Sequence, residues 1–168
     1  MSGGEPGSHR AAKLPPPLPE DEYHRIFSRV PRLTVEVVVA SPERGVLLAL
    51  RDLGPCRGLW HLPGGTVRFG EPLVDAVRRV ARDELGATVT VGPLLGHIEY
   101  PSHYEHGLDS PVGLAFPATI AAPFELPANC AWFPEVPDSI HDEQRRFLIE
   151  HRLARARGST AGEDRRRR

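Results

Sequence analysis

The sequence predicts an α/β protein of the α+β kind, an α/β/α sandwich built on a mixed sheet. Two apolar, β-branched runs at 33–40 and 46–50 are joined by a short Pro- and Gly-containing turn, which is typical of paired strands. Helical apolar periodicity appears near the middle of the chain and again near its end. Because strands and helices alternate irregularly, with short antiparallel-looking connections, the pattern favours a mixed sheet over a doubly wound parallel one.

Length and composition indicate one domain with extensions. The chain has 168 residues and a net charge of -1, which favours neither a nucleic-acid-binding protein nor a membrane-surface protein. No apolar run approaches the length of a membrane span, and the first residues lack the apolar core of a signal peptide. Cys56 and Cys130 fit no metal-binding spacing and are too few for a disulfide framework. We therefore expect reduced cysteines in a cytoplasmic protein.

The two ends of the chain differ in composition from its centre. Residues 1–19 are rich in Gly, Ser and Pro and predict a disordered leader, and 156–168 predict a disordered basic tail. The domain itself is expected at 20–155. It opens with apolar residues at helical spacing from Tyr23 to Val30, stopped by Pro31, which indicates a short helix that braces the domain.

The remaining elements follow in order. After the strands at 33–40 and 46–50, a polar loop leads to an apolar run at 59–63 and a double glycine, which is expected to form a turn before a helix. The helix has Pro72 in its first turn, a continuous apolar face, and Gly86 as its C-terminal stop. Downstream we expect strands at 88–91, 94–100, 112–120 and about 130–133, a polar loop at 101–110, and a last helix from a capping box at Ser139 to about 155.

The double glycine and the helix after it carry the chemistry. Only glycine lets backbone approach a ligand this closely, and the Gly64 carbonyl is then free for a hard cation. Asp83 and Glu84 at the helix end can supply carboxylate oxygens, which Mg²⁺ prefers. Arg79 lies one turn before Asp83 and can orient the acidic pair, while Glu71 at the helix start can bond loop amides. The segment therefore predicts a divalent metal that holds a diphosphate.

This segment resembles the signature of the Nudix hydrolases, G-x5-E-x7-R-E-U-x-E-E-x-G-U, in which U is a bulky aliphatic residue. The match runs from Gly65 through Glu71 and Arg79 to about Ala87, and the lead-in from Leu59 to Gly64 also looks like the family's. The resemblance extends over roughly residues 32–155. It implies an α/β/α sandwich and Mg²⁺-dependent (or Mn²⁺-dependent) hydrolysis of a nucleoside diphosphate linked to another group.

The chain departs from this signature at the position after Arg79. Val80 stands where the family has its first Glu, so one metal ligand or base is missing, and Asp83 replaces the first Glu of the acidic pair. The GDP-mannose mannosyl hydrolase branch of the family also lacks this first Glu, and the chain partly resembles that branch. That branch's Gln-His pair would fall near Leu126 and Pro127, so the resemblance gives little support to its reaction at sugar carbon.

The resemblance and the residue chemistry together give a set of expected roles. Gly64, Asp83 and Glu84 are expected to hold the metal, with Arg79 orienting Glu84. Arg51 is expected to neutralise phosphate charge. The expected substrate contacts are Gly65, Glu71, Arg51, His103 and Glu105. The general base is left open among His103, Glu105, His106, Asp109 and, outside this loop, His141, and strand alternation leaves open whether Glu99 faces the site.

Three functions follow in order of support. The first is a pyrophosphohydrolase acting on a nucleotide sugar or an ADP-ribose-like compound, a small-molecule substrate. The second is a nucleoside triphosphate pyrophosphatase, although the full cluster of acidic residues that would favour it is missing. The third is a non-catalytic nucleotide-binding domain. No nucleic-acid or membrane partner is expected, and the apolar face of the first helix is compatible with a homodimer.

Overall fold

The computed structural model describes residues 18–52 and 56–156. Nearly all of the expected leader and tail lies outside these ranges. None of the described helices is long and apolar enough to cross a membrane. In chain order the elements are α1 (Glu20–Phe27), β1 (Arg32–Val38), β2 (Ala40–Ser41), β3 (Gly45–Leu50), β4 (Trp60–His61), β5 (Gly64–Thr66), α2 (Leu73–Leu85), β6 (Val89–Val91), β7 (Gly96–Glu99), α3 (Pro101–Glu105), β8 (Pro111–Ile120), β9 (Cys130–Phe133) and α4 (Asp142–Glu150).

The strands form two sheets, and the larger one is mixed, as predicted. Its order is β5-β1-β8-β6, with β7 also paired to β8. The long strands β1 and β8 run parallel, whereas the pairings of β5 with β1, and of β6 and β7 with β8, are antiparallel. The smaller sheet has the order β2-β3-β4, with β9 paired to β3. The site described below lies where β5 forms an edge of the larger sheet.

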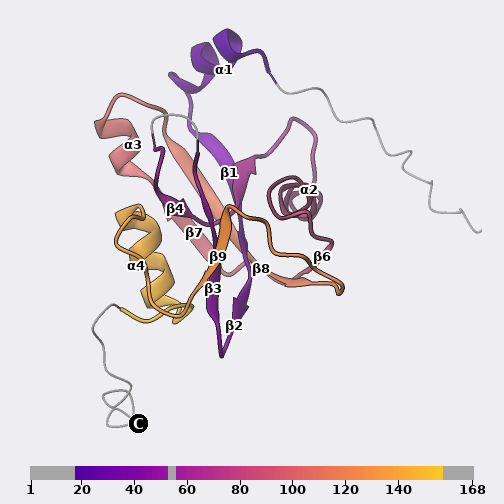
Figure 1. Cartoon of the computed structure of the whole chain (residues 1–168). Helices are drawn as coiled ribbons and strands as arrows, with labels where there is room; N and C mark the ends of the chain where they lie inside the picture. Colours follow the sequence, from indigo (N-terminus) through magenta and orange to yellow (C-terminus); the bar gives the residue numbers. More distant parts are fainter. Residues whose placement is uncertain (1–17, 53–55, 157–168) are drawn as a thin grey trace, which may run out of the picture.

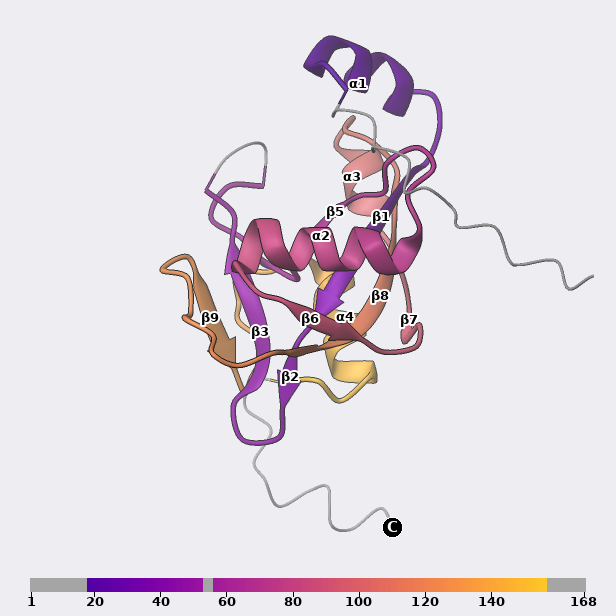
Figure 2. The same cartoon turned by 90° about the vertical axis from the view of Figure 1, so that its right-hand side faces the viewer.

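Two hydrophobic cores lie on opposite faces of β1. Val35 and Val37 pack in the core that contains the apolar face of α2, whereas Val38 packs in the core that contains Phe147 of α4. This alternation is the pleat of a strand that is buried on both faces. The two helices therefore lie on either side of the strands (Figures 1 and 2), and the sequence prediction of an α/β/α sandwich is confirmed.

Helix α2 forms where its apolar periodicity predicts it. Its buried residues are Ala76, Val77, Val80, Ala81 and Leu85. Gly86 ends the helix with a φ of 62°, a left-handed conformation that glycine adopts without strain. The Gly86 and Ala87 amides donate to the last helical carbonyls, which satisfies groups that the helix itself leaves unpaired.

Several local predictions are wrong, and tertiary contacts explain them. Gly64 and Gly65 form strand β5 and not a turn, because both pair with β1. The expected loop at 101–110 contains the short helix α3. Helix α4 is capped by His141, without a side-chain cap, and not by Ser139. The Trp60 amide donates to the Ser139 carbonyl at 2.7 Å, which ties that residue to β4.

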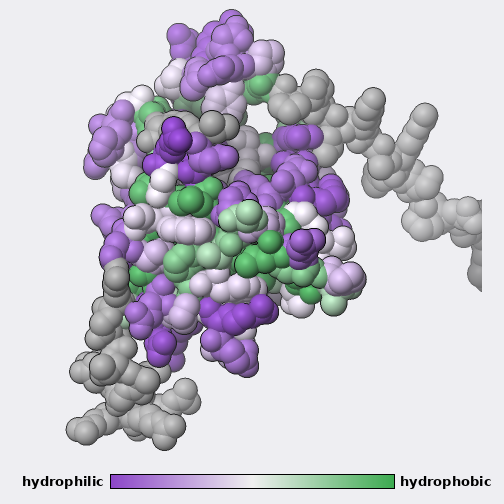
Figure 3. Space-filling view, viewed as in Figure 1, coloured by the Kyte–Doolittle hydropathy of each residue, from purple (hydrophilic) through white to green (hydrophobic). Residues whose placement is uncertain are grey.

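Helix α1 forms as predicted but lies at one end of the molecule, away from both cores (Figures 1 and 2). None of its residues is buried. The Arg32 guanidinium lies 5.9 Å from the ring centroid of Tyr23. On the face seen in Figure 3, hydrophilic residues dominate α1, whereas hydrophobic residues gather over the middle of the domain. The contribution of α1 as a brace is therefore small.

Candidate functional site

The strand register directs the carbonyl of Gly64 away from β1, toward the open edge of the sheet. The Val37 amide donates to Pro63, and the Val67 amide donates to Leu33. In an antiparallel ladder these bonded positions alternate with unbonded ones, so Gly64 turns its peptide groups away from β1. Since β5 is an edge strand, the Gly64 carbonyl has no strand partner on that side.

Glu84 of α2 lies against the backbone of Gly64. Burial raises the pKa of Glu84 to about 7. The Gly64 backbone and the Arg51 guanidinium favour its charged form and partly offset this effect, whereas Asp83 adds to it. The Asp83 side chain is 57% exposed. Thus the structure brings Gly64 and Glu84 together at one sheet edge, with the exposed Asp83 next to Glu84 in the chain.

An open polar groove of about 480 Å³ lies beside Glu84, between the ends of β3, β4 and α2. Arg51, His61 and Asn129 line it together with Asp83 and Glu84. The His61 Nδ1 atom lies 2.7 Å from the Leu62 carbonyl, which leaves Nε2 as the free acceptor. Burial lowers the pKa of His61 to about 4. Asp52 also lines the groove, which therefore offers one cation, one neutral imidazole and three carboxylates to a ligand.

The donor atoms in the groove fit a hard divalent cation. Two adjacent carboxylates and a backbone carbonyl are the oxygen ligands that Mg²⁺ takes in proteins. A carboxylate whose pKa is raised by burial and by a neighbouring acid is one whose charge a cation would stabilise. The residues that could hold such an ion are Gly64, Asp83 and Glu84, the set expected from the sequence.

Arg79 and Glu71 have a different role from the one expected. The Arg79 guanidinium forms a bidentate pair with Glu71, at 2.7 and 2.8 Å, and also donates to the Thr66 carbonyl. Its distance to Asp83 is 3.9 Å. The Glu71 side chain is fully buried, at 0% exposed, and also accepts from the Arg68 amide. The pair thus holds the 66–71 turn to α2, and both Glu71 oxygens are engaged within the fold. Arg79 keeps the expected ion pair with Asp83, so its influence on the acidic pair is through Asp83.

Val80 faces the core beneath β5. It is 2% exposed, and a Cβ atom placed on Gly65 would lie only 2.9 Å from its Cγ2 atom. Gly65 is therefore needed for close packing of the strand on the helix. It also lines the small cavity, so its contact with substrate stays a prediction. The apolar side chain at position 80 contributes to the α2 core and supplies no ligand to the groove.

The structure also reveals a buried acidic residue that sequence reasoning missed. Glu36 in β1 is 5% exposed and lines a small cavity of about 60 Å³ with Tyr100 and Gln144. Its Oε1 atom accepts hydrogen bonds from Tyr100 at 3.1 Å and from Thr34 at 3.2 Å. Gln144 donates to the Tyr100 hydroxyl at 2.8 Å. The signal was a charged residue flanked on both sides by valines in a strand that the sequence predicts to be buried.

Two glycines make room for this carboxylate. A Cβ atom at Gly64 would lie 2.3 Å from Glu36 Oε2, and one at Gly113 would lie 2.6 Å from Glu36 Oε1. Position 64 must therefore be glycine because a side chain there would collide with Glu36 of β1. The cavity adjoins the groove, since Arg51 and His61 line both.

Glu36→Gln is expected to stabilise the protein at alkaline pH. Burial raises the pKa of Glu36 from 4.5 to about 8, so between these values the folded state holds a proton that the unfolded state releases. The free energy of unfolding of the wild type therefore falls with rising pH across this window. Glutamine mimics the protonated form and does not titrate, so by pH 9 the variant should be more stable by an amount on the order of a few kcal/mol.

Thermal melts of both proteins from pH 5 to pH 9 check this expectation. The melting temperatures should lie close together at pH 5, diverge progressively between about pH 5 and pH 8 with the variant higher, and keep a constant difference above about pH 8. Glu99→Gln is a matched control, because Glu99 is exposed on β7. Parallel pH profiles for wild type and Glu36→Gln would contradict the raised pKa.

The expected loop residues separate into two groups. His103 lines the cavity, and its Nδ1 atom lies 3.0 Å from Asp109 Oδ1. Burial raises the pKa of Asp109, but His103 and Arg32 outweigh that effect and hold it at about 2. Glu105 lines a separate groove. Glu105 is exposed, as are its neighbour His106 and Glu99 of β7.

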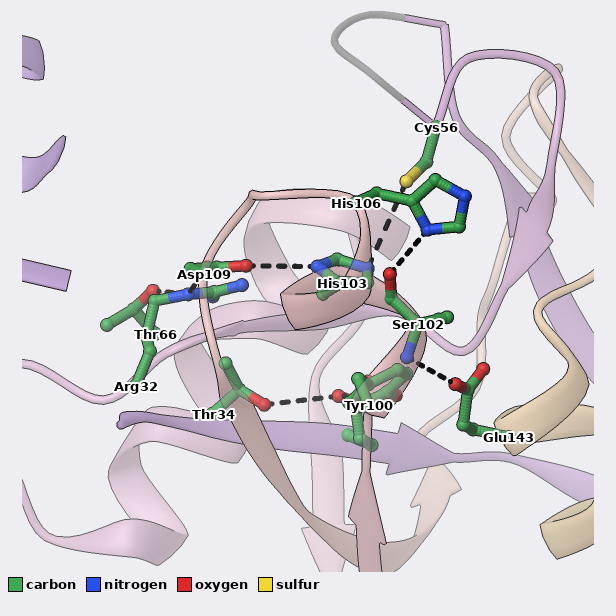
Figure 4. A network of polar contacts seen from close by, with 11 residues as sticks. Arg32, Thr34, Cys56, Thr66, Tyr100, Ser102, His103, His106, Asp109 and Glu143 are labelled. Carbon is green, nitrogen blue, oxygen red and sulfur yellow. Dashed lines mark hydrogen bonds and ion pairs between the residues drawn. The ribbon is translucent and has the colours of Figure 1, made fainter. Parts of the chain in front are cut away.

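Figure 4 shows how His103 is held. Asp109 bonds the Nδ1 atom of His103 and accepts a hydrogen bond from Arg32. The Nε2 atom of His103 faces Cys56. His103 therefore points at Cys56 and not at the acidic pair of the groove. This orientation does not support His103 as the base for a reaction at Glu84. His141 also lines the cavity, and burial lowers its pKa.

Comparison with known proteins points to one family. A family model described as the NUDIX domain matches residues 30–134. The chain is 44% identical over 95 residues to the low-salt glycan biosynthesis protein Agl8 of Haloferax volcanii, covering 55% of this chain and 60% of that protein. It is 32% identical over 77 residues to an ADP-ribose pyrophosphatase of Methanocaldococcus jannaschii, covering 46% of this chain and 45% of that protein.

A solved structure shares the fold. The crystal structure of a MutT NUDIX hydrolase from Burkholderia pseudomallei superposes with a TM-score of 0.62 at 23% identity, covering 73% of this chain and 98% of that one. The chain spans less than two thirds of the length of the two curated relatives described here.

Proposed function

Because the chain belongs to the Nudix family, we propose that it is a Mg²⁺-dependent (or Mn²⁺-dependent) hydrolase that cleaves the pyrophosphate of a nucleoside diphosphate linked to another group. The observation that carries this proposal is the position of the Glu84 carboxylate, which lies against the Gly64 backbone at the edge of β5 and lines a polar groove together with Arg51. Oxygen donors on one side and a guanidinium on the other suit a metal-bound diphosphate.

The chain's own groups would act mainly through position and charge. Gly64, Asp83 and Glu84 would hold the cation, which when bound neutralises phosphate charge and acidifies a water. Arg51 lies close enough to Glu84 to lower its pKa, so it would neutralise charge on the departing phosphate. His61 places an unprotonated nitrogen beside both the groove and the cavity.

The nature of the linked group is supported by the relatives and not by a motif. One relative is named for glycan biosynthesis and another as an ADP-ribose pyrophosphatase, and both names favour a nucleotide that carries a sugar. The open groove beside Glu84, at about 480 Å³, has room for such a group, whereas the cavity beyond His61, at about 60 Å³, is too small for a sugar ring.

A substrate panel tests the proposal. The protein would be assayed with Mg²⁺ or Mn²⁺ against ADP-ribose, nucleotide sugars, dinucleoside diphosphates and nucleoside triphosphates, with product identification by chromatography. We expect release of nucleoside monophosphate from a sugar-bearing diphosphate, and loss of turnover after chelation of the metal. Preferred release of pyrophosphate from a triphosphate would support the triphosphate pyrophosphatase instead. Tight binding of one compound without turnover of any would refute the enzyme and support a binding domain.

A further inference from the structure

Three side chains with soft or borderline metal-binding atoms converge beside the cavity. Cys56 follows β3, His103 belongs to α3, and His141 caps α4. One ligand atom from each lies within 4.8 Å of the others. The Cys56 Sγ atom is 4.0 Å from His103 Nε2, and the His103 and His141 ring centroids are 5.2 Å apart. Three distant segments thus place their donor atoms at one point.

The orientation of His103 is the one that a metal-ligating histidine requires. Its Nδ1 atom is bonded to Asp109, and Asp109 is held in turn by Arg32, as Figure 4 shows. A carboxylate on one ring nitrogen fixes the tautomer and leaves the other nitrogen free to bind a cation. Here the free nitrogen, Nε2, is the one that faces Cys56.

We propose that Cys56, His103 and His141 form a site for Zn²⁺ or a similar borderline transition-metal ion. One thiolate and two imidazoles are typical zinc ligands, and Mg²⁺ does not choose such a set. Three protein ligands leave a fourth position for water or an anionic ligand. Because His103 and His141 line the cavity, that position opens toward it. The site is distinct from the oxygen-lined groove of Glu84 and does not depend on the proposed hydrolase activity.

A second interpretation of the same residues is a reactive thiol. In this interpretation Cys56 is the nucleophile, His103 is its base, and Asp109 orients the histidine. Cys56 is only 8% exposed, however, and this interpretation leaves His141 without a role. The geometry therefore favours the metal site.

Cobalt titration of the full-length, metal-free protein tests the proposal. Co²⁺ replaces Zn²⁺ and gives a thiolate charge-transfer absorption only when sulfur is a ligand, so binding at Glu84 remains distinguishable. We expect one equivalent of Co²⁺ to produce this band and Zn²⁺ to displace it. Cys56→Ser should abolish the band, and His103→Ala or His141→Ala should weaken Co²⁺ affinity by about tenfold or more.

Matched controls sharpen the result. Cys130 is the other buried cysteine, and His106 is exposed close to His103. Cys130→Ser and His106→Ala should therefore keep the band, and circular dichroism would confirm that all variants are folded. Absence of the band in the wild type, or its loss in Cys130→Ser but not in Cys56→Ser, would overturn the proposal. Rapid alkylation of Cys56 that requires His103 and is unaffected by Zn²⁺ would overturn it in favour of the reactive thiol.

Discussion

Glu84→Gln is expected to lower turnover by roughly a hundredfold or more while the protein stays folded, because a metal-held diphosphate needs the carboxylate charge. Glutamine keeps the shape of the side chain and removes only that charge. Burial raises the pKa of Glu84 to about 7, so the charged form is less favourable in the folded state than in the unfolded state. Loss of the charge should therefore leave the melting temperature at pH 8 unchanged or slightly higher.

Steady-state kinetics with the best substrate of the panel, together with thermal melts, measure both effects. Asp75→Asn is the matched control, since Asp75 lies on the same helix, is 54% exposed and pairs with Arg78. It should retain wild-type turnover. Undiminished turnover in Glu84→Gln would refute its assignment as a metal ligand, and a large fall in melting temperature would show that the residue acts through the fold.

Arg79→Ala is expected to lower the free energy of unfolding by about 3–5 kcal/mol, the cost of leaving one partner of a buried ion pair behind. The stranded group would be the Glu71 carboxylate, whose side chain is fully buried. The Thr66 carbonyl would lose its guanidinium donor as well. Since the 66–71 turn connects β5 to α2, its loosening should also displace Gly64 from Glu84 and reduce turnover.

Denaturant unfolding and a double-mutant cycle measure this effect. Arg79→Met combined with Glu71→Leu should cost less than the sum of the single changes, because no charge then stays unpaired. Arg78→Ala is the neighbouring control, and its exposed pair with Asp75 should contribute about 0.5 kcal/mol or less. If Arg79→Ala were as stable as Arg78→Ala but inactive, Arg79 would act on substrate and not on the fold.

The local sequence pattern was sufficient to predict those helices and strands that are decided by residues close together in the chain. The spacing of apolar residues from Leu73 to Leu85 predicted α2, and Gly86 predicted its end. The expected strands around 33–40, 46–50 and 112–120 appear as β1, β3 and β8, with shifts of only a few residues at their ends. Each of these depends on periodicity, chain stiffness and turn chemistry, which are carried by consecutive residues.

Local reasoning failed where a partner comes from elsewhere in the chain. A spacing of four residues predicted the ion pair of Arg79 with Asp83, which is present at 3.9 Å, but it gave no sign of the closer pair with Glu71 at 2.7 Å. Ser139 has the residue type of a helix cap, but its carbonyl accepts a bond from Trp60, and the helix begins after His141.

By itself the sequence determined the mixed sheet, its long strands, helix α2 and the acidic residues that end this helix, since these follow from local periodicity and from one contiguous motif. Only the tertiary structure decided that Glu36 is buried, that Glu71 belongs to Arg79, and that Cys56 meets His103 and His141. The physical reason is that burial and pairing depend on which distant segments pack together. The spacing of residues along the chain does not encode contacts between distant segments, although these contacts set both the charge and the ligands of the site.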